Sequence, residues 1–301
     1  MVRARGLRRF GAAVVLAGLA TGCGGSGGGG SHDAALAEPA LPAVLTEPSD
    51  GAAVPLPLDG YTVSSADSAL IFQAREAATR TCMKSKGFDY APAVFPAAPP
   101  PSPLDPDFLG ILSAAAARQT GYHRPPPPAG QGAVQQQRND SPEYRKALEG
   151  SGGTPGAADQ APDRGCMAAF DQQPGATPAA PAKDDVVGGL RSKAYEHATG
   201  DSRVKAAITK WAGCMTGQGY HYSTPTQASS AAWADPASQQ EKDTAAADMA
   251  CKTQAQLLGT WYAVEAGYQT ELIQQNEPAL QAVKDRANQR VATAKKVLGA
   301  G

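Results

Sequence analysis

Four cysteines offer the clearest chemistry in this chain: Cys82, Cys166, Cys214 and Cys251. An even number of cysteines in an oxidising compartment is typical of structural disulfide bonds. A redox-active pair is the alternative use. However, none of the four has the close C-x-x-C spacing or the cationic surroundings that lower a thiol pKa. We therefore predict two structural disulfides and no redox centre.

A metal site would need cysteine and histidine ligands at short, regular spacings. No such cluster occurs, because the four histidines are scattered along the chain: His32, His123, His197 and His221. His221 lies between two tyrosines, which could suggest a binding or proton-transfer site. A surface histidine that follows a helix explains the same pattern more simply. We expect neither a metal nor a cofactor.

The sequence contains none of the common nucleophile, metalloprotease or nucleotide-binding motifs. Three glutamates, Glu265, Glu271 and Glu277, could form a carboxylate cluster. Their positions equally suit the solvated side of an amphipathic helix, and we favour that interpretation. The sequence therefore predicts no catalytic residue and a protein that is not an enzyme.

A nine-residue pattern, C-M-x-x-x-G-[FY]-x-Y, occurs at 82–90 and again at 214–222. Each copy ends a predicted helix, where glycine supplies the left-handed residue and the aromatic residue folds back onto the apolar face. A further cysteine follows each copy. The repeat therefore suggests the pairs Cys82–Cys166 and Cys214–Cys251, although four cysteines allow three connectivities.

Apolar residues recur at helical spacing in most of the chain outside its Pro/Gly-rich stretches. The predicted helices are 65–86, 109–118, 142–148, 184–198, 202–218, 239–277 and 280–297. Ser238 and Glu241 form a capping box that begins the longest of them, and Pro278 must break or kink it. No sustained alternation of apolar and polar residues occurs, so the predicted fold class is mainly α.

The predicted organisation is two disulfide-stapled helical units behind a tether. The first unit covers 63–175, with a Pro/Gly-rich irregular insertion at 92–141, and the second covers 183–299. Residues 23–62 are Gly-rich and then Pro/Ala-rich, which indicates a long disordered tether. A flexible chain of this length spans roughly 35 Å. Much of the chain is therefore not expected to contribute to a core.

Residues 1–22 have the order of a secretory signal: four arginines, an apolar run of about ten residues and small residues before Cys23. The apolar run is roughly half of the ~20 residues that span a bilayer. The sequence Leu19-Ala20-Thr21-Gly22-Cys23 resembles the lipobox of bacterial lipoproteins. That resemblance implies cleavage before Cys23, a diacylglycerol on its sulfur, and a place on the extracytoplasmic face of the cell membrane. Export by the Sec or the Tat route stays open.

The two copies of the repeat, with 247–252 and 261–269, resemble uncharacterised membrane-anchored lipoproteins of actinobacteria. The resemblance covers the signal, 65–90 and 142–298, and leaves out the Pro-rich insertion. It implies a membrane-tethered helical module outside the cytoplasm. It carries over no catalytic residue.

Charge narrows the possible partners of the mature chain. Without the four arginines of the signal, 23 basic residues face 28 acidic ones, a net charge of −5. This balance argues against a nucleic-acid partner, which needs a basic surface. A non-enzymatic envelope scaffold with a protein partner is the function we favour. The alternative is a solute- or ligand-binding lipoprotein associated with a transporter, although such folds alternate strands and helices.

Three aromatic residues are candidates for a ligand or partner contact: Trp211, Trp261 and Tyr268. Packing in the core is the simpler use of aromatic residues on the apolar stripe of a helix. Burial decides between the two uses, because a contact surface would leave an exposed apolar patch of several hundred Å².

Overall fold

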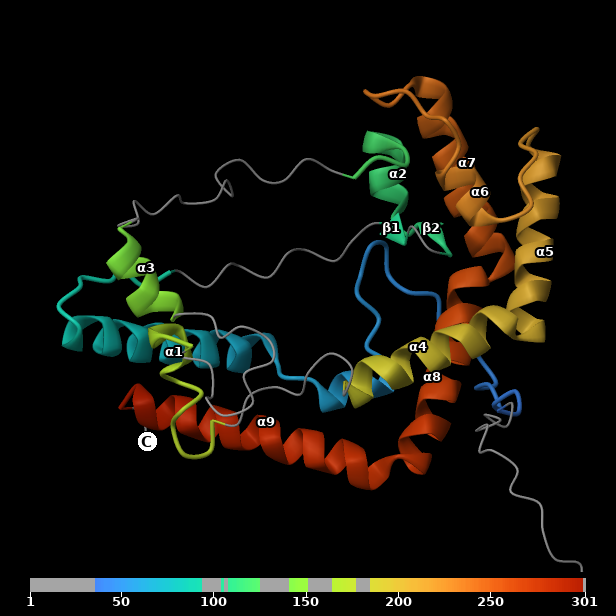
Figure 1. Cartoon of the computed structure of the whole chain (residues 1–301). Helices are drawn as coiled ribbons and strands as arrows, with labels where there is room; N and C mark the ends of the chain where they lie inside the picture. The colour runs from blue at the N-terminus through green and yellow to red at the C-terminus, as the bar shows by residue number, and fades with distance from the viewer. Residues whose placement is uncertain are drawn as a thin grey trace, which may run out of the picture. The chain divides into compact units, whose positions relative to one another are not determined.

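The computed structural model of the chain describes residues 36–93, 104–105, 108–124, 141–150, 164–176 and 185–299. The predicted signal peptide, Cys23 and most of the predicted insertion lie outside these ranges. The described residues are mainly helical, which confirms the predicted fold class (Figure 1). The helices are α1 (Ser65–Ser85), α2 (Ala114–Thr120), α3 (Pro142–Glu149), α4 (Val186–Gly200), α5 (Ser202–Gly217), α6 (Pro225–Ser229), α7 (Gln239–Ala255), α8 (Leu257–Gln275) and α9 (Glu277–Val297).

The remaining regular structure is short. There are two 3-10 helices in the described residues. The first, η1 (Pro57–Tyr61), precedes α1 in the sequence, and the second, η2 (Cys166–Ala168), packs against α1. Strands β1 (Leu104–Asp105) and β2 (Gly110–Ile111) form one antiparallel pair. No helix within the described ranges is long and apolar enough to cross a membrane.

Short polar side chains begin most of the helices. Ser64 accepts a hydrogen bond from the Asp67 amide at the start of α1, and Ser238 accepts one from the Glu241 amide at the start of α7. Such caps satisfy backbone N–H groups that have no partner within the helix. This explains why the predicted starts of α1 and α7 agree with the structure to within one residue.

The repeated motif ends α1 and α5 in the same way. Gly87 and Gly219 have φ angles of +84° and +90°. The Phe88 amide donates to the Met83 carbonyl at 3.0 Å, and the Tyr220 amide donates to the Met215 carbonyl at 2.9 Å. These are the hydrogen bonds of a Schellman motif, which needs a left-handed residue after the helix. The motif therefore encodes a helix end, as predicted.

The helix predicted from 239 to 277 is wrong in one respect. It is divided into α7 and α8 at Gln256, which adopts a left-handed conformation with φ +52°. No glycine or proline marks this position. Pro278 lies in the first turn of α9, where its missing N–H costs nothing. As a result α1 and α9, with 21 residues each, are the longest described helices.

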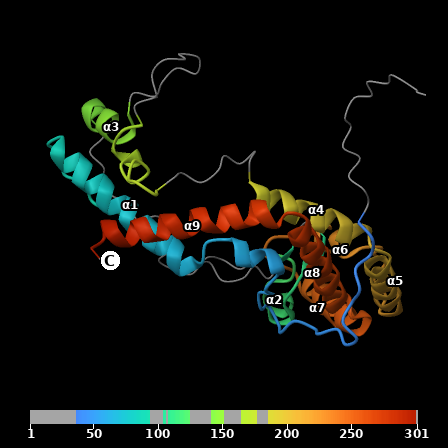
Figure 2. The ribbon, with the colours of Figure 1, turned by 90° about the horizontal axis from the view of Figure 1, so that it is seen from below.

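The main core lies among α4, α5, α7 and α8, and it includes Trp211, Leu257 and Trp261. Helix α1 packs along α9 (Figure 2), and the two share a smaller core formed by Ala74, Phe170, Ala176 and Ala294. A third cluster surrounds Met83 and Cys166 under α3.

The two predicted helical units are less separate than the sequence suggests. Leu109, Ile111 and Tyr122 lie in the predicted insertion of the first unit, yet they belong to the main core. The ordered helix in this region is α2, which begins at Ala114 rather than at 109 and packs on α7. The described residues from Leu36 onward therefore belong to one compact unit in which both predicted units take part.

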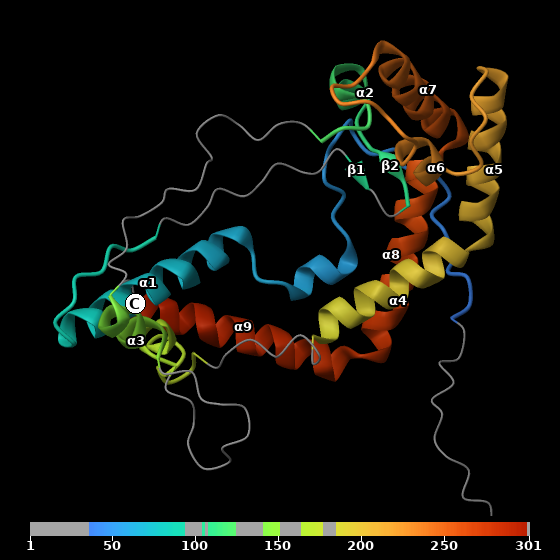
Figure 3. The same ribbon diagram turned by 45° about the horizontal axis from the view of Figure 1, so that its top comes forward.

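Residues 36–62 also differ from the expected tether, and we call them the strap (Figure 3). Leu58 in the strap is fully buried, and its amide donates to the buried Gln269 side chain of α8 at 2.9 Å. Pro39 is buried against Gly267, where a Cβ atom would lie 2.6 Å from the proline ring. Its composition predicted a disordered segment. The prediction is wrong for 36–62, because a Pro/Ala-rich chain can pack on helices without forming a helix or strand of its own.

Candidate functional site

Both disulfide bonds join the pairs that the repeat suggests. Cys82 is bonded to Cys166 and Cys214 to Cys251, with Cα–Cα distances of 5.5 and 5.6 Å. Each bond connects the last turns of one helix to a segment far along the chain. The cysteines are therefore used for structure, and Cys82 also lines a groove.

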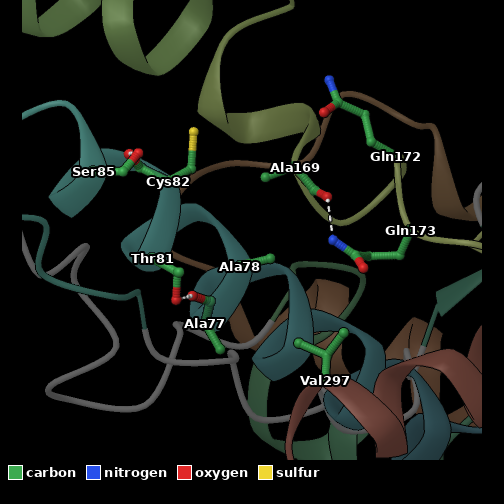
Figure 4. A pocket seen from close by; sticks show the side chains of 9 residues that line it. All are labelled: Ala77, Ala78, Thr81, Cys82, Ser85, Ala169, Gln172, Gln173 and Val297. Atoms are coloured by element: carbon green, nitrogen blue, oxygen red, sulfur yellow. Dashed lines mark hydrogen bonds between the residues drawn. The ribbon is translucent and has the colours of Figure 1, made fainter.

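An open groove of about 400 Å³ lies beside Cys82, between α1, the segment after η2 and the end of α9 (Figure 4). Its lining is neutral and mostly small: Ala77, Ala78, Thr81, Cys82, Ser85, Ala169, Gln172, Gln173 and Val297. The hydroxyl groups of Thr81 and Ser85 donate to carbonyls of their own helix, at 3.0 and 2.6 Å. The groove therefore offers methyl groups and neutral amides to a ligand, and none of these lining residues is a general acid or base.

A second, smaller groove of about 250 Å³ is lined in part by Tyr90, Leu148 and Met167. Its charged members are Arg75 and Glu76. The Glu76 carboxylate accepts hydrogen bonds from the Tyr90 hydroxyl at 2.9 Å and from the Ala93 amide at 2.5 Å. This carboxylate holds the segment that follows α1 in place.

The three candidate contact residues are all buried. Trp211 is 0% exposed, and Trp261 and Tyr268 are each 2% exposed. The Trp261 ring lies 4.6 Å from Phe108 and 5.3 Å from Tyr195, measured between ring centroids. These residues pack the main core, so they do not form the exposed aromatic patch that a ligand or partner contact would need.

An ion pair lies inside the main core and was not predicted from the sequence. Lys252 Nζ lies 3.0 Å from the Asp248 carboxylate, and both side chains are fully buried. Asp248 also accepts hydrogen bonds from Trp211 Nε1 at 2.8 Å and from the Tyr122 hydroxyl at 3.2 Å. Lys252 donates to the Ile111 carbonyl at 2.7 Å. The network connects α7 to α5 through Trp211, and to the 108–124 segment through Tyr122 and the Ile111 carbonyl.

The network affects the ionisation of its members. Burial raises the pKa of Asp248, and the Lys252 cation opposes that rise. Burial lowers the pKa of Lys252, against the opposing effect of Asp248. Burial, together with the Asp248 charge and hydrogen bond, raises the pKa of the Tyr122 hydroxyl. The pair is stable in the core only because each charge has several close partners.

Glu241 departs from its predicted role in a capping box. Its amide is capped by Ser238, but its own side chain is fully buried and points to the end of α2. One carboxylate oxygen accepts from the Tyr122 amide at 2.8 Å, and the other lies 3.3 Å from His123 Nε2. Gly121 leaves room for this carboxylate, because a Cβ atom there would lie 2.4 Å from it. Glu241 thus fixes the 108–124 segment on α7.

Glu265 is the exception among the three glutamates expected on a solvated face. It is 9% exposed and accepts from Gln269 Nε2 at 3.2 Å. Burial raises the pKa of Glu265, and the Asp105 and Asp59 charges add to the rise, whereas hydrogen bonds oppose it. Glu271 is partly exposed and Glu277 is exposed, as is His221. Within the described ranges no group of three His, Cys, Asp or Glu side chains could hold a metal ion.

The strap contributes a set of carboxylates that bond to the first turns of other helices. Glu38 accepts from the Ser202 amide and hydroxyl at the start of α5, at 2.7 and 2.8 Å. Glu47 accepts from the Gly259 amide of α8 at 3.2 Å. Asp50 accepts from the Ala114 and Ala115 amides of α2, at 2.5 and 3.2 Å. A carboxylate at this end of a helix meets free N–H groups and the positive end of the helix dipole.

A second set of contacts holds the strap through side chains of the helices. The Arg203 guanidinium donates to the Pro39 carbonyl and to both carboxylate oxygens of Asp201. Burial alone would raise the pKa of Asp201, but the Arg203 hydrogen bonds and charge outweigh it and hold that pKa below its ordinary value. Further along, Asp59 lies 2.6 Å from the Arg191 guanidinium.

The chain matches no protein-family model, no curated protein and no solved structure.

Proposed function

We propose that this protein is a lipid-anchored, extracytoplasmic module that acts by contact rather than by catalysis. In this proposal the lipid is attached at Cys23, and the helices form a scaffold or interaction surface in the cell envelope. The protein needs no cofactor, and its partner is another envelope protein.

The two disulfide bonds are the observation that carries the proposal. Disulfides persist in oxidising compartments outside the cytoplasm and are rare inside it. Each bond joins the first residue of the same helix-end motif to a cysteine later in the chain, so the two bonds share one sequence pattern. The signal-like residues 1–22 and the lipobox-like sequence before Cys23 agree with this location.

Burial of the ionisable groups supports a contact role. Asp248, Lys252 and Glu241 are the deepest charged side chains, and each is bonded to groups that hold helices together. A catalytic acid or base would instead need a cavity in which a substrate could reach it. The groove beside Cys82 presents neutral groups, which suit the binding of a partner or ligand without chemistry on it.

The alternative, a solute-binding subunit of a transporter, receives less support. Those subunits alternate strands and helices around a sheet. Here the described strands are two residues long each and form a single pair. The 400 Å³ groove is within the usual volume range of small-molecule sites, roughly 300–1,000 Å³, but it is open and has few apolar side chains larger than alanine.

Intact-mass measurement of the membrane fraction tests the anchor directly. The full chain would be expressed in a bacterial host beside a Cys23→Ala variant. We expect the mass of a mature chain that begins at Cys23 and carries a diacylglyceryl group. In the variant, this lipidated chain should be absent from the membrane fraction. A soluble product cleaved elsewhere in both forms would refute the lipid anchor.

A further inference from the structure

The strap lies between the proposed anchor at Cys23 and the helices. Its first hydrogen bond to them is made by Glu38, fifteen residues after Cys23. Its last attached segment is η1, which ends at Tyr61, three residues before Ser64, the N-cap of α1. Between these points the strap contacts α5, α8, α2 and α4 in turn. The first described residues after the proposed anchor are thus fixed to helices that follow much later in the sequence.

The length of chain between Cys23 and the first attached residue limits how far the helices can lie from the anchor. Fifteen residues can span at most about 50 Å, whatever their conformation. If the strap were not docked, the helices would begin at Ser64, forty-one residues after Cys23, and the limit would be about 140 Å. The docked strap therefore removes nearly two thirds of the distance that the chain could otherwise cover.

We propose that docking of the strap limits the reach of the helices from the membrane. This inference rests on the proposed lipid anchor at Cys23. The strap then acts as a fixed-length mount rather than as a loose linker. Partners of the protein must lie within the envelope layer that this mount allows.

The contacts that hold the strap are specific to it. Three of its carboxylates, Glu38, Glu47 and Asp50, bond to backbone amides of three different helices, and Gly267 leaves space for Pro39. Leu58 fills a fully buried position at the far end. Loss of one carboxylate frees one helix start, whereas loss of several removes the attachment along its length.

Energy transfer to a lipid acceptor measures the reach. Cys23 is the one cysteine outside the two disulfides, so the mature chain can be coupled through it to a maleimide lipid in phosphatidylglycerol vesicles. A fluorescent amino acid, the energy donor, would replace Lys205, which is exposed and lies one turn from Ser202. The strap variant is Glu38→Ala, Asp50→Ala, Asp59→Ala. Its matched control removes the same charge from exposed positions: Glu143→Ala, Glu149→Ala, Glu196→Ala.

We expect at least a twofold loss of transfer efficiency in the strap variant and none in the control. Hydrogen exchange on the same samples should show at least tenfold faster exchange of the Ser202 and Ala114 amides in the strap variant, with α7 unchanged. Equal transfer and equal exchange in both variants would overturn the proposal. Because the lipid is attached chemically, a failure of native lipidation at Cys23 would appear in the mass measurement and not here.

Discussion

Lys252 and Asp248 form an ion pair of 3.0 Å in the core, one helical turn apart on α7, with neither side chain exposed. Their remaining hydrogen-bonding capacity is used by Trp211, Tyr122 and the Ile111 carbonyl. The pair thus fixes the 108–124 segment and α5 on the same face of α7. Removal of either charge leaves the other without compensation in a medium of low polarity.

Replacement of the lysine alone should therefore be costly. We expect Lys252→Met to lower the free energy of unfolding by about 3–5 kcal/mol, since it leaves the Asp248 carboxylate buried without its cation. The double variant Asp248→Asn, Lys252→Met should lose less than the single one, because no buried charge remains. Urea unfolding followed by circular dichroism measures both. A double variant less stable than Lys252→Met would contradict this account.

The burial of Glu265 leads us to expect that the stability of the protein depends on pH. Burial raises the folded-state pKa of this carboxyl above its unfolded value, so ionisation in the folded state opposes folding. Glu265→Gln should be more stable than the wild type at pH 7. The wild type should regain the difference as the pH falls through the raised pKa, where its carboxyl becomes protonated. A stability difference that stays constant between pH 7 and pH 4 would show that the carboxyl is not the cause.

The disulfide bonds should contribute much of the stability. Cys214 and Cys251 are 37 residues apart, and on the chain-entropy model their bond stabilises the fold by about 4 kcal/mol. The Cys214→Ala, Cys251→Ala variant should lose a comparable amount in urea unfolding. Peptide mapping without reduction should recover Cys82 linked to Cys166 and Cys214 linked to Cys251. A peptide joining Cys82 to Cys214 would exclude the observed pairing.

Two helical glycines give opposite predictions for the same substitution. Gly213 in α5 has no neighbour within 4 Å of an added Cβ, so Gly213→Ala should stabilise the protein by about 0.5–1 kcal/mol. Gly267 in α8 has the Pro39 ring at 2.6 Å, so Gly267→Ala should displace the strap and destabilise the protein. Thermal unfolding of the two variants compares them directly. A similar gain from both would mean that Pro39 does not occupy this site in solution.

Local signals made much of the fold predictable. Caps such as Ser238, and the glycines of the C-M-x-x-x-G motif, determine where helices begin and end through contacts a few residues apart. The mainly helical class and the helix ends at Gly87 and Gly219 follow from such signals. The disulfide pairing was suggested because each cysteine of the motif is followed by another.

Features that depend on distant partners were not predictable. The break at Gln256 has no local mark, since neither glycine nor proline stands at this exposed, left-handed residue. Asp248 and Lys252 look like an ordinary surface pair on a helix until the 108–124 segment covers them. Glu38 and Asp50 read as parts of a polar linker, since the helix starts that they cap lie far along the chain.

The strap has a further consequence for how the protein folds. Glu38, Glu47 and Leu58 are among the first described residues to be synthesised, yet their partners follow 164 to 212 residues later. The N-terminal part of the nascent chain therefore cannot complete its own contacts. Docking is completed only after α5 and α8 have emerged, so it is a late event in folding, and a chain stalled before α8 lacks the partners of Glu47 and Leu58.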